Sequence, residues 1–224
     1  DGYNSIDGGW FLVNGEDQDM IREKYEAVWK QIAERFAKYD EHLIFESMNE
    51  ESDGTYDGDP NKEYYANLNQ YNQIFVDTVR GTGEKNTHRW LLVPGWNTNI
   101  EYTVGDYGFE MPTDEKCSAG ESRMMVSVHY YDPWDYCGIE DLKTILWGEY
   151  GDNLIEVNGF PKMNKAKWGD ESYLDDLFSR MQEKFVKNDI PVIIGEYGCI
   201  DKSSAYADFA GQIQGNRAYW DGYV

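Results

Sequence analysis

Two glutamates stand where short apolar segments of the sequence end. Glu50 closes the segment LIFESMNE, and Glu196 follows the segment PVIIG directly. A charge at the end of a buried strand costs free energy, so these two positions favour a functional role over that of an ordinary surface charge. A pair of such carboxyl groups can divide the work of glycosidic cleavage, because one attacks carbon while the other protonates the departing oxygen. We therefore expect Glu50 and Glu196 to carry chemistry of this kind.

A third apolar segment ends in His129, Tyr130 and Tyr131. Alternation along a strand puts His129 and Tyr131 on one face and Tyr130 on the other. A tyrosine hydroxyl can donate to a nucleophilic carboxylate and orient it, while a neutral histidine can bond to substrate or to the acid/base. Both side chains are expected to reach one pocket.

Glu46 is an alternative acid to Glu50. It shares the strand parity of Glu50, so the two side chains are predicted to face the same way. A hydrogen-bonded structural role inside the fold is the other interpretation of Glu46.

Tryptophans are expected both at the site and in the core. Trp10, Trp96 and Trp134 fall in predicted strand-end loops, where an indole ring can stack on the apolar face of a sugar. Trp29 follows the apolar stripe of a helix and is expected in the core.

The elements that position these residues follow from the apolar pattern. Strands are predicted over residues 43–48, 90–94, 124–131 and 191–195, and loops rich in Gly, Asp, Asn and Pro over residues 51–61, 95–114 and 132–138. Helical faces are predicted from Ile21, Tyr25, Val28, Ile32 and Phe36, with Asp17 or Asp19 as the N-cap, and from Leu174, Leu177, Phe178, Met181 and Phe185. Strands alternating with helices indicate a parallel α/β fold.

The composition limits the kinds of partner that the protein can bind. A formal net charge of −22 disfavours nucleic acid and anionic membranes, and 16% aromatic residues suit a neutral sugar ligand. Three histidines and three cysteines in no metal-binding spacing predict neither a metal site nor a cofactor. The acidic loop 51–61 does not match the calcium-binding loop of a helix-loop-helix motif. Counted from Asp53, position twelve is Tyr64, and counted from Asp57 it is Leu68, whereas the motif has a glutamate there. No apolar run is long enough for a membrane span and no charged-then-apolar leader begins the sequence, so any secretion signal is expected to have been removed or excluded. The protein is expected to be secreted and extracellular.

The ordered segments LIFESMNE, VSVHYYDPW and PVIIGEYG resemble strands four, six and seven of glycoside hydrolase family 5, especially its subfamily 4 endoglucanases and xyloglucanases. The segment WLLVPGWNTN resembles the fifth strand and its following loop. The resemblance implies that Glu50 is the acid/base, that Glu196 is the nucleophile and that Asn49 holds the sugar 2-hydroxyl. His129 and Tyr131 match the His-x-Tyr of strand six. The family pattern often continues Asn-Glu-Pro, whereas Glu51 follows here.

The resemblance also implies a (β/α)8 barrel, the TIM barrel, as the fold. DGYNSIDGGW resembles the loop after strand three and RAYWDGYV the helix before strand eight. The family's strand-two Arg, strand-three His and strand-eight Trp are not recognisable. We therefore expect residues 1–224 to be one glycoside hydrolase catalytic domain whose barrel is incomplete here, with N- and C-terminal parts missing.

The function implied is that of a retaining endo-β-1,4-glucanase, a cellulase-type hydrolase that cleaves internal bonds of cellulose or a related β-glucan by double displacement. The expected partner is that polysaccharide or its oligosaccharides, bound by a monomeric domain without a cofactor. A xyloglucanase or a mannanase of the same fold is the alternative enzyme. A noncatalytic sugar-binding module is the alternative of another class.

Overall fold

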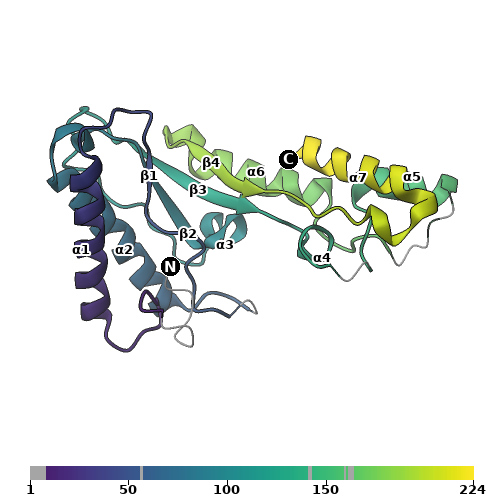
Figure 1. The fold of residues 1–224 in the computed structure, drawn as a ribbon, viewed down its shortest axis with the longest axis horizontal. Helices are drawn as coiled ribbons and strands as arrows, with labels where there is room; N and C mark the ends of the chain where they lie inside the picture. The colour runs from purple at the N-terminus through teal and green to yellow at the C-terminus, as the bar shows by residue number, and fades with distance from the viewer. Residues whose placement is uncertain (1–8, 56–57, 141–142, 159, 161–163) are drawn as a thin grey trace. The chain divides into compact units, whose positions relative to one another are not determined.

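The computed structural model describes residues 9–55, 58–140, 143–158, 160 and 164–224. The chain divides into two compact units, drawn with all labelled elements in Figure 1. Unit 1 comprises Asp1–Val128 and Met181–Gly195, and unit 2 comprises His129–Arg180 and Glu196–Val224. No helix among the described residues is long and apolar enough to cross a membrane.

The elements alternate along the chain as the sequence predicts. The α-helices are α1 (Gln18–Phe36), α2 (Lys62–Gly81), α3 (Ile100–Val104), α4 (Trp134–Cys137), α5 (Gly148–Asn158), α6 (Glu171–Lys184) and α7 (Ala210–Tyr223). The strands are β1 (Phe45–Glu46), β2 (Leu91–Asn99), β3 (Met124–Tyr130) and β4 (Val192–Tyr197). Short 3-10 turns are η2 (Glu84–Thr87), η4 (Val186–Asn188), η5 (Ser203–Ala205) and η6 (Ala207–Phe209).

The strands form one sheet in the order β1-β2-β3-β4, and β1 pairs with β2 in parallel with Phe45 opposite Leu91. The predicted α/β class is confirmed. Several strand boundaries differ from the prediction, since β1 has only two residues, β2 runs on to Asn99 and β4 runs on to Tyr197. The predicted loop from Gly95 is therefore strand as far as Asn99, where the Asn99 side chain accepts from the Tyr102 N–H and caps α3.

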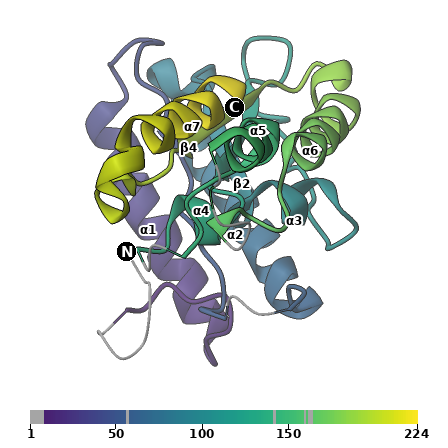
Figure 2. The same cartoon turned by 90° about the vertical axis from the view of Figure 1, so that its right-hand side faces the viewer.

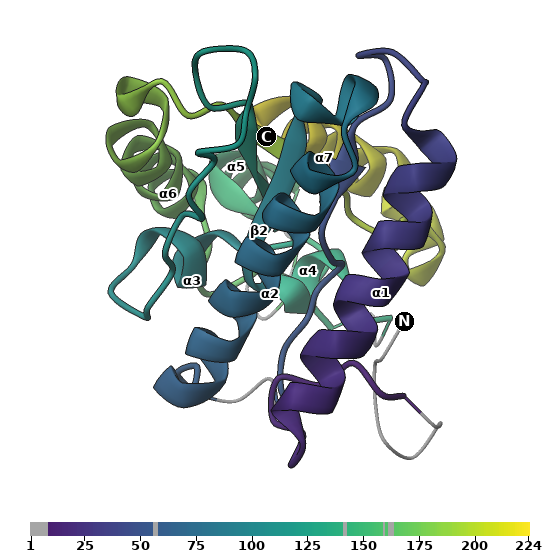
Figure 3. The same cartoon turned by 90° about the vertical axis from the view of Figure 1, so that its left-hand side faces the viewer.

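In unit 1, α1 and α2 lie side by side (Figure 3). The buried stripe of α1 is Ile21, Tyr25, Trp29 and Ala33. The predicted stripe was wrong in its second half, because Val28 and Phe36 are exposed. The Trp29 ring packs on Phe75 and Phe45, at 4.5 and 5.8 Å between ring centroids. The buried face of α1 is therefore the face that carries Trp29. The predicted place of Trp29 in the core is confirmed.

Unit 2 has its own core around α5 and α7, which lie next to each other in Figure 2. Ile145, Leu146, Leu154, Phe160 and Ile213 form a buried cluster. The second predicted helix, α6, buries the Leu174, Leu177 and Met181 side chains as expected. The predicted helical character of RAYWDGYV is also confirmed, because this segment lies at the end of α7.

Buried polar contacts attach α7 to the chain that follows β3. The Asn216 amide accepts from the Trp147 N–H at 2.7 Å and from the Tyr136 hydroxyl at 3.1 Å. It also donates to the Trp147 carbonyl at 2.8 Å. A side chain that satisfies a backbone N–H and C=O in this way replaces a strand partner, so α7 fixes the chain around Trp147.

Candidate active site

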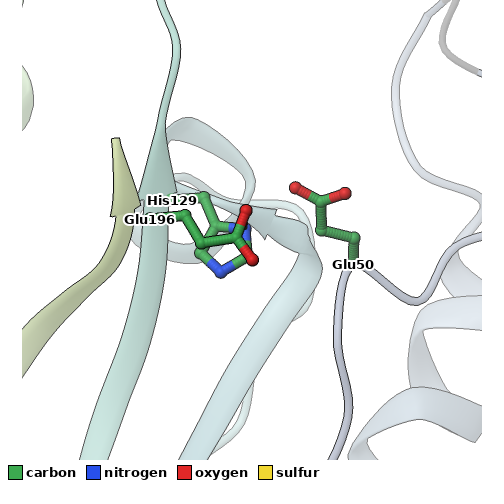
Figure 4. Close-up of side chains that lie close together, drawn as sticks. All are labelled: Glu50, His129 and Glu196. Atoms are coloured by element: carbon green, nitrogen blue, oxygen red, sulfur yellow. Dashed lines mark ion pairs between the residues drawn. The ribbon is translucent and has the colours of Figure 1, made fainter. Parts of the chain in front are cut away.

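Glu196 lies near the end of β4, and two side chains of unit 2 contact one of its oxygens. The Tyr131 hydroxyl donates to Oε2 at 2.9 Å, and Nδ1 of His129 lies 3.6 Å from the same oxygen. Figure 4 shows the His129 ring beside the Glu196 carboxylate. The Glu196 side chain is 46% exposed, so the carboxylate is held in place while it remains open to a ligand.

Strand alternation at the end of β3 produces this arrangement. His129 and Tyr131 point to the Glu196 side, whereas Tyr130 is buried on the other side, where its ring stacks on Trp220 at 5.9 Å between centroids. The Trp220 indole N–H in turn donates to the Asp132 carbonyl at 3.2 Å. The prediction that His129 and Tyr131 share a face is confirmed.

Trp134 begins α4 and is the tryptophan of the predicted sugar-binding set that has most exposed surface, at 54%. Its ring stands edge-on to Tyr131, 6.1 Å away between centroids. It also covers Gly138, where an added Cβ would lie 2.3 Å from the ring. The lack of a side chain at Gly138 thus leaves room for the indole ring in this exposed position.

In unit 1, Glu50 follows β1 but is not part of the strand (Figure 4). Its φ is 50°, which is left-handed backbone. The strand alternation from which the shared parity of Glu46 and Glu50 was predicted therefore does not extend to Glu50, because period-two alternation holds only in extended chain. Glu46 lies in β1 and accepts from the Ser127 hydroxyl at 2.5 Å, which suits the structural interpretation of that residue.

The segment leading to Glu50 is held by α1 and α2 of unit 1. The Ser47 carbonyl accepts from the Tyr25 hydroxyl at 2.8 Å and from the Trp29 indole N–H at 3.2 Å. The Ser47 hydroxyl donates to Asn72 of α2 at 2.6 Å, and the Asn72 amide donates to the Pro94 carbonyl at 2.9 Å. Because these groups are buried, each bond replaces one that water would otherwise make.

Sequence reasoning missed the role of Thr98 and Glu51. The Glu50 N–H donates to Thr98 Oγ1 at 3.0 Å, and the Asn97 N–H donates to the Glu51 carbonyl at 2.9 Å. Asn97 and Thr98 have φ values of 52° and 50°, which cost roughly 1–3 kcal/mol each for residues other than glycine. Asparagine tolerates this backbone, but a β-branched threonine does not, and no sequence signal points to it.

The Glu51 carboxyl group is buried at 7% exposure and accepts from the Val13 N–H at 3.3 Å. Burial raises the pKa of Glu51 to about 8, although the bond from Val13 opposes this shift. The group is therefore largely protonated at neutral pH, unlike a surface glutamate.

The remaining predicted site residues differ in exposure. Asn49 is exposed beside Glu50, and Trp10 is half-buried with the Lys24 ammonium 4.2 Å from its ring centroid. Trp96 was wrongly placed in a loop, since it lies in β2 at 3% exposure and packs on Tyr65. Extension of the strand past Pro94 turns this ring inward, so it offers no free face to a sugar.

The three cysteines do not favour thiol chemistry. Cys117, Cys137 and Cys199 are free thiols, and burial raises the pKa of Cys199 to about 11. A thiol of this kind stays protonated and is a poor nucleophile.

Comparison with known proteins shows the family. The family model described as Cellulase (glycosyl hydrolase family 5) matches residues 8–223. The chain belongs to glycosyl hydrolase family 5. The similarity confirms the family that the sequence motifs indicate.

Several family 5 relatives are close in sequence. Endoglucanase A of Paenibacillus barcinonensis is 53% identical over 208 residues, which are 91% of this chain and 50% of that protein. A xyloglucan-specific endo-β-1,4-glucanase of Bacteroides ovatus is 35% identical over 197 residues, 86% of this chain and 36% of that protein. The chain thus spans half or less of the length of these relatives.

Solved family 5 structures match the fold. A family 5 xyloglucanase from Paenibacillus pabuli, solved with a ligand, is 51% identical with a TM-score of 0.89, over 100% of this chain and 60% of that one. A Bacteroides ovatus xyloglucanase in complex with a XXXG heptasaccharide gives a TM-score of 0.82 at 32% identity, over 97% and 44% of the two chains. The fold is that of the corresponding part of the family's (β/α)8 barrel.

Proposed function

We propose that the protein containing this chain is a retaining endo-β-1,4-glucanase that cleaves bonds within cellulose or a related β-glucan. The observation that carries the proposal is the Glu196 carboxylate, half-exposed near the end of β4 and bound on one oxygen by Tyr131 and His129. The endoglucanase of Paenibacillus barcinonensis, 53% identical, supports the substrate class. The substrate polymer is too large to enter a cell, so we also propose that the protein is secreted.

The first step of the proposed reaction forms a covalent glycosyl-enzyme. Both contacts of Glu196 fall on Oε2, so Oε1 is the oxygen that attacks the anomeric carbon. The bond from this carbon to the leaving sugar breaks, and Glu50 gives its proton to the leaving oxygen. The Glu196 side chain is 46% exposed, so the carboxylate is accessible for this approach.

The second step releases the sugar. Water attacks the anomeric carbon, Glu50 takes a proton from that water, and the bond to Glu196 breaks. Both carboxyl groups return to their starting protonation states, and two displacements leave the β configuration unchanged. The mechanism requires the two carboxyl groups about 5 to 5.5 Å apart when the enzyme acts.

Other side chains are proposed to bind the polymer. Asn49, exposed beside Glu50, is suited to bond the sugar 2-hydroxyl, and Trp134 is suited to stack on a glucose ring. His129 remains a candidate for a hydrogen bond to substrate. A monomer with a neutral polysaccharide as its partner needs no cofactor for this chemistry.

Xyloglucan is the second candidate substrate. The Paenibacillus pabuli structure, 51% identical, is that of a xyloglucanase, and the Bacteroides ovatus relative is xyloglucan-specific. The shape of the subsites, rather than the catalytic pair, decides between glucans. Comparing kcat/KM on soluble cellulose, mixed-linkage glucan, xyloglucan and mannan will rank these substrates.

Trapping the intermediate tests the proposed nucleophile. The protein, incubated with a 2-deoxy-2-fluoro cellobioside that carries a dinitrophenyl leaving group, should gain one 2-deoxy-2-fluorocellobiosyl group on Glu196 and release dinitrophenolate, and peptide mapping should locate the label. Glu196→Ala should lose glucan turnover but still bind cello-oligosaccharides, whereas Glu149→Ala, an exposed glutamate of α5, should be unaffected. A label on another residue, or an inverted product anomer by NMR, contradicts the proposal. Turnover that survives in Glu196→Ala would show that another group is the nucleophile, whereas a parent protein that binds glucan without turnover would favour the noncatalytic binding module.

A further inference from the structure

The end of β2 holds the main chain on both sides of Glu50. Thr98 Oγ1 accepts the Glu50 N–H at 3.0 Å, and the Asn97 N–H donates to the carbonyl of Glu51 at 2.9 Å. These two bonds lie before and after the α-carbon of Glu50. The direction in which the Glu50 side chain leaves the backbone therefore depends on the position of residues 97 and 98.

Thr98 adopts a backbone conformation that its own side chain opposes. Its φ of 50° lies in the left-handed region, which a β-branched residue rarely enters and which glycine enters without strain. The Thr98 side chain is fully buried. The threonine thus destabilises the local backbone, and its hydroxyl bond to Glu50 is the contact that compensates.

The neighbouring residues keep the strained segment in place. The Tyr65 hydroxyl accepts from the Trp96 N–H at 3.1 Å and donates to the Tyr102 carbonyl at 2.8 Å. On the other side of Thr98, the Thr103 hydroxyl donates to the Asn99 carbonyl at 2.7 Å. A strained residue persists when its surroundings over-determine it, and such residues cluster at functional sites.

We propose that Thr98 is a positioning residue for proton transfer by Glu50, acting through the Glu50 backbone rather than by contact with substrate. The inference rests on the proposed role of Glu50 as general acid and base. Loss of the Thr98 hydroxyl leaves the Glu50 N–H without its acceptor and lets the carboxyl group move away from the leaving oxygen. The defect should then resemble a weakened acid rather than an unfolded enzyme.

The leaving group distinguishes these outcomes. A sugar leaving group needs a proton from the acid, whereas 2,4-dinitrophenolate departs without one. A misplaced Glu50 should therefore slow glucan cleavage and spare the formation of the glycosyl-enzyme from a dinitrophenyl cellobioside. A general structural defect would slow both substrates together.

The experiment compares Thr98→Gly, Thr98→Val and Thr98→Ser in the same protein. Glycine removes the hydroxyl while it relieves the backbone strain, so this variant should fold, and valine keeps the side-chain shape without the acceptor. Both should lose about 10- to 100-fold in kcat/KM on glucan, the effect of a group displaced by about 1 Å. Their kcat/KM on dinitrophenyl cellobioside should stay within about threefold of the parent, because acid catalysis contributes little there. Thr98→Ser should match the parent on both substrates.

Two results would overturn the inference. If Thr98→Gly and Thr98→Val cleave glucan at the parental rate, or lose both activities equally, Thr98 does not position the acid. Glu50→Ala serves as the reference, with an expected loss of about 10²- to 10⁴-fold on glucan and a smaller loss on the dinitrophenyl substrate. If Glu50→Ala shows no such selectivity, the proposed function of Glu50 itself is wrong and the role of Thr98 ends with it.

Discussion

At the scale of single residues, the Tyr131 hydroxyl is the contact that most directly constrains Glu196. It donates to Oε2 at 2.9 Å, and the ring is supported edge-on by Trp134. A phenylalanine at this position keeps the ring packing and removes only the donor. We expect Tyr131→Phe to lower kcat/KM on glucan by about 10- to 100-fold, because the proposed nucleophile Glu196 is no longer held in place.

Unit 2 offers a matched control for this change. The Tyr223 hydroxyl donates to the Asp175 carboxylate at 3.2 Å on the exposed surface, so Tyr223→Phe removes a similar bond elsewhere. This variant should keep parental kinetics. If the two variants have equal melting temperatures and only Tyr131→Phe has a lower steady-state rate, the loss is due to the contact with Glu196. Equal rates for the two variants would contradict the proposed orientation of the nucleophile.

At the scale of elements, α1 shows what a cap contributes. Asp17 accepts from the Met20 N–H at 3.0 Å, which identifies it rather than Asp19 as the N-cap. We expect Asp17→Ala to destabilise the protein by about 1 kcal/mol, which lowers the melting temperature by about 2–4 °C at this chain size. The measurement is thermal unfolding followed by circular dichroism.

Asp19 is the control because it lies in the first turn of α1 with a 96% exposed side chain. Its loss removes a distant ion pair to Arg22 at 3.8 Å, and exposed pairs of this kind contribute little. A larger effect of Asp19→Ala than of Asp17→Ala would show that the cap is assigned wrongly.

At the scale of the whole molecule, the buried Glu51 couples folding to pH. Burial raises its pKa from 4.5 to about 8, so between these values the folded protein holds a proton that the unfolded chain has released. Stability must then fall as pH rises through this window and level off above pH 8. The shift corresponds to about 3 to 5 kcal/mol in total.

Glu51→Gln tests this linkage, since the amide oxygen can still accept from the Val13 N–H while it carries no charge. The variant should match the parent near pH 5 and exceed its free energy of unfolding at pH 9, as measured by urea denaturation. The net charge of −22 affects both proteins across the same range, so their difference isolates residue 51. Glu23→Gln, at an exposed position of α1, should show no such divergence. Parallel curves for Glu51→Gln and the parent would disprove the linkage.

The sequence alone was sufficient for the α/β class, the approximate strands, the family and the residues that we propose as catalytic. These features are encoded locally. Apolar runs of strand length and the ordered motifs around Glu50, His129 and Glu196 remain readable without long-range contacts. Alternation also predicted that His129 and Tyr131 share a face, because β3 is regular up to its last residue.

The tertiary structure decided the features that depend on where elements end and what packs against them. Glu50 leaves the strand pattern of Glu46 because β1 ends at Glu46 and the chain turns left-handed at Glu50. Trp96 is buried because β2 continues beyond Pro94 and packs the ring on Tyr65. The hydrogen bond from the Glu50 N–H to Thr98 Oγ1 joins residues 48 positions apart, and no local sequence pattern encodes such a contact. A strained threonine is stable there only because the surrounding hydrogen bonds hold it, which is a property of the folded chain alone.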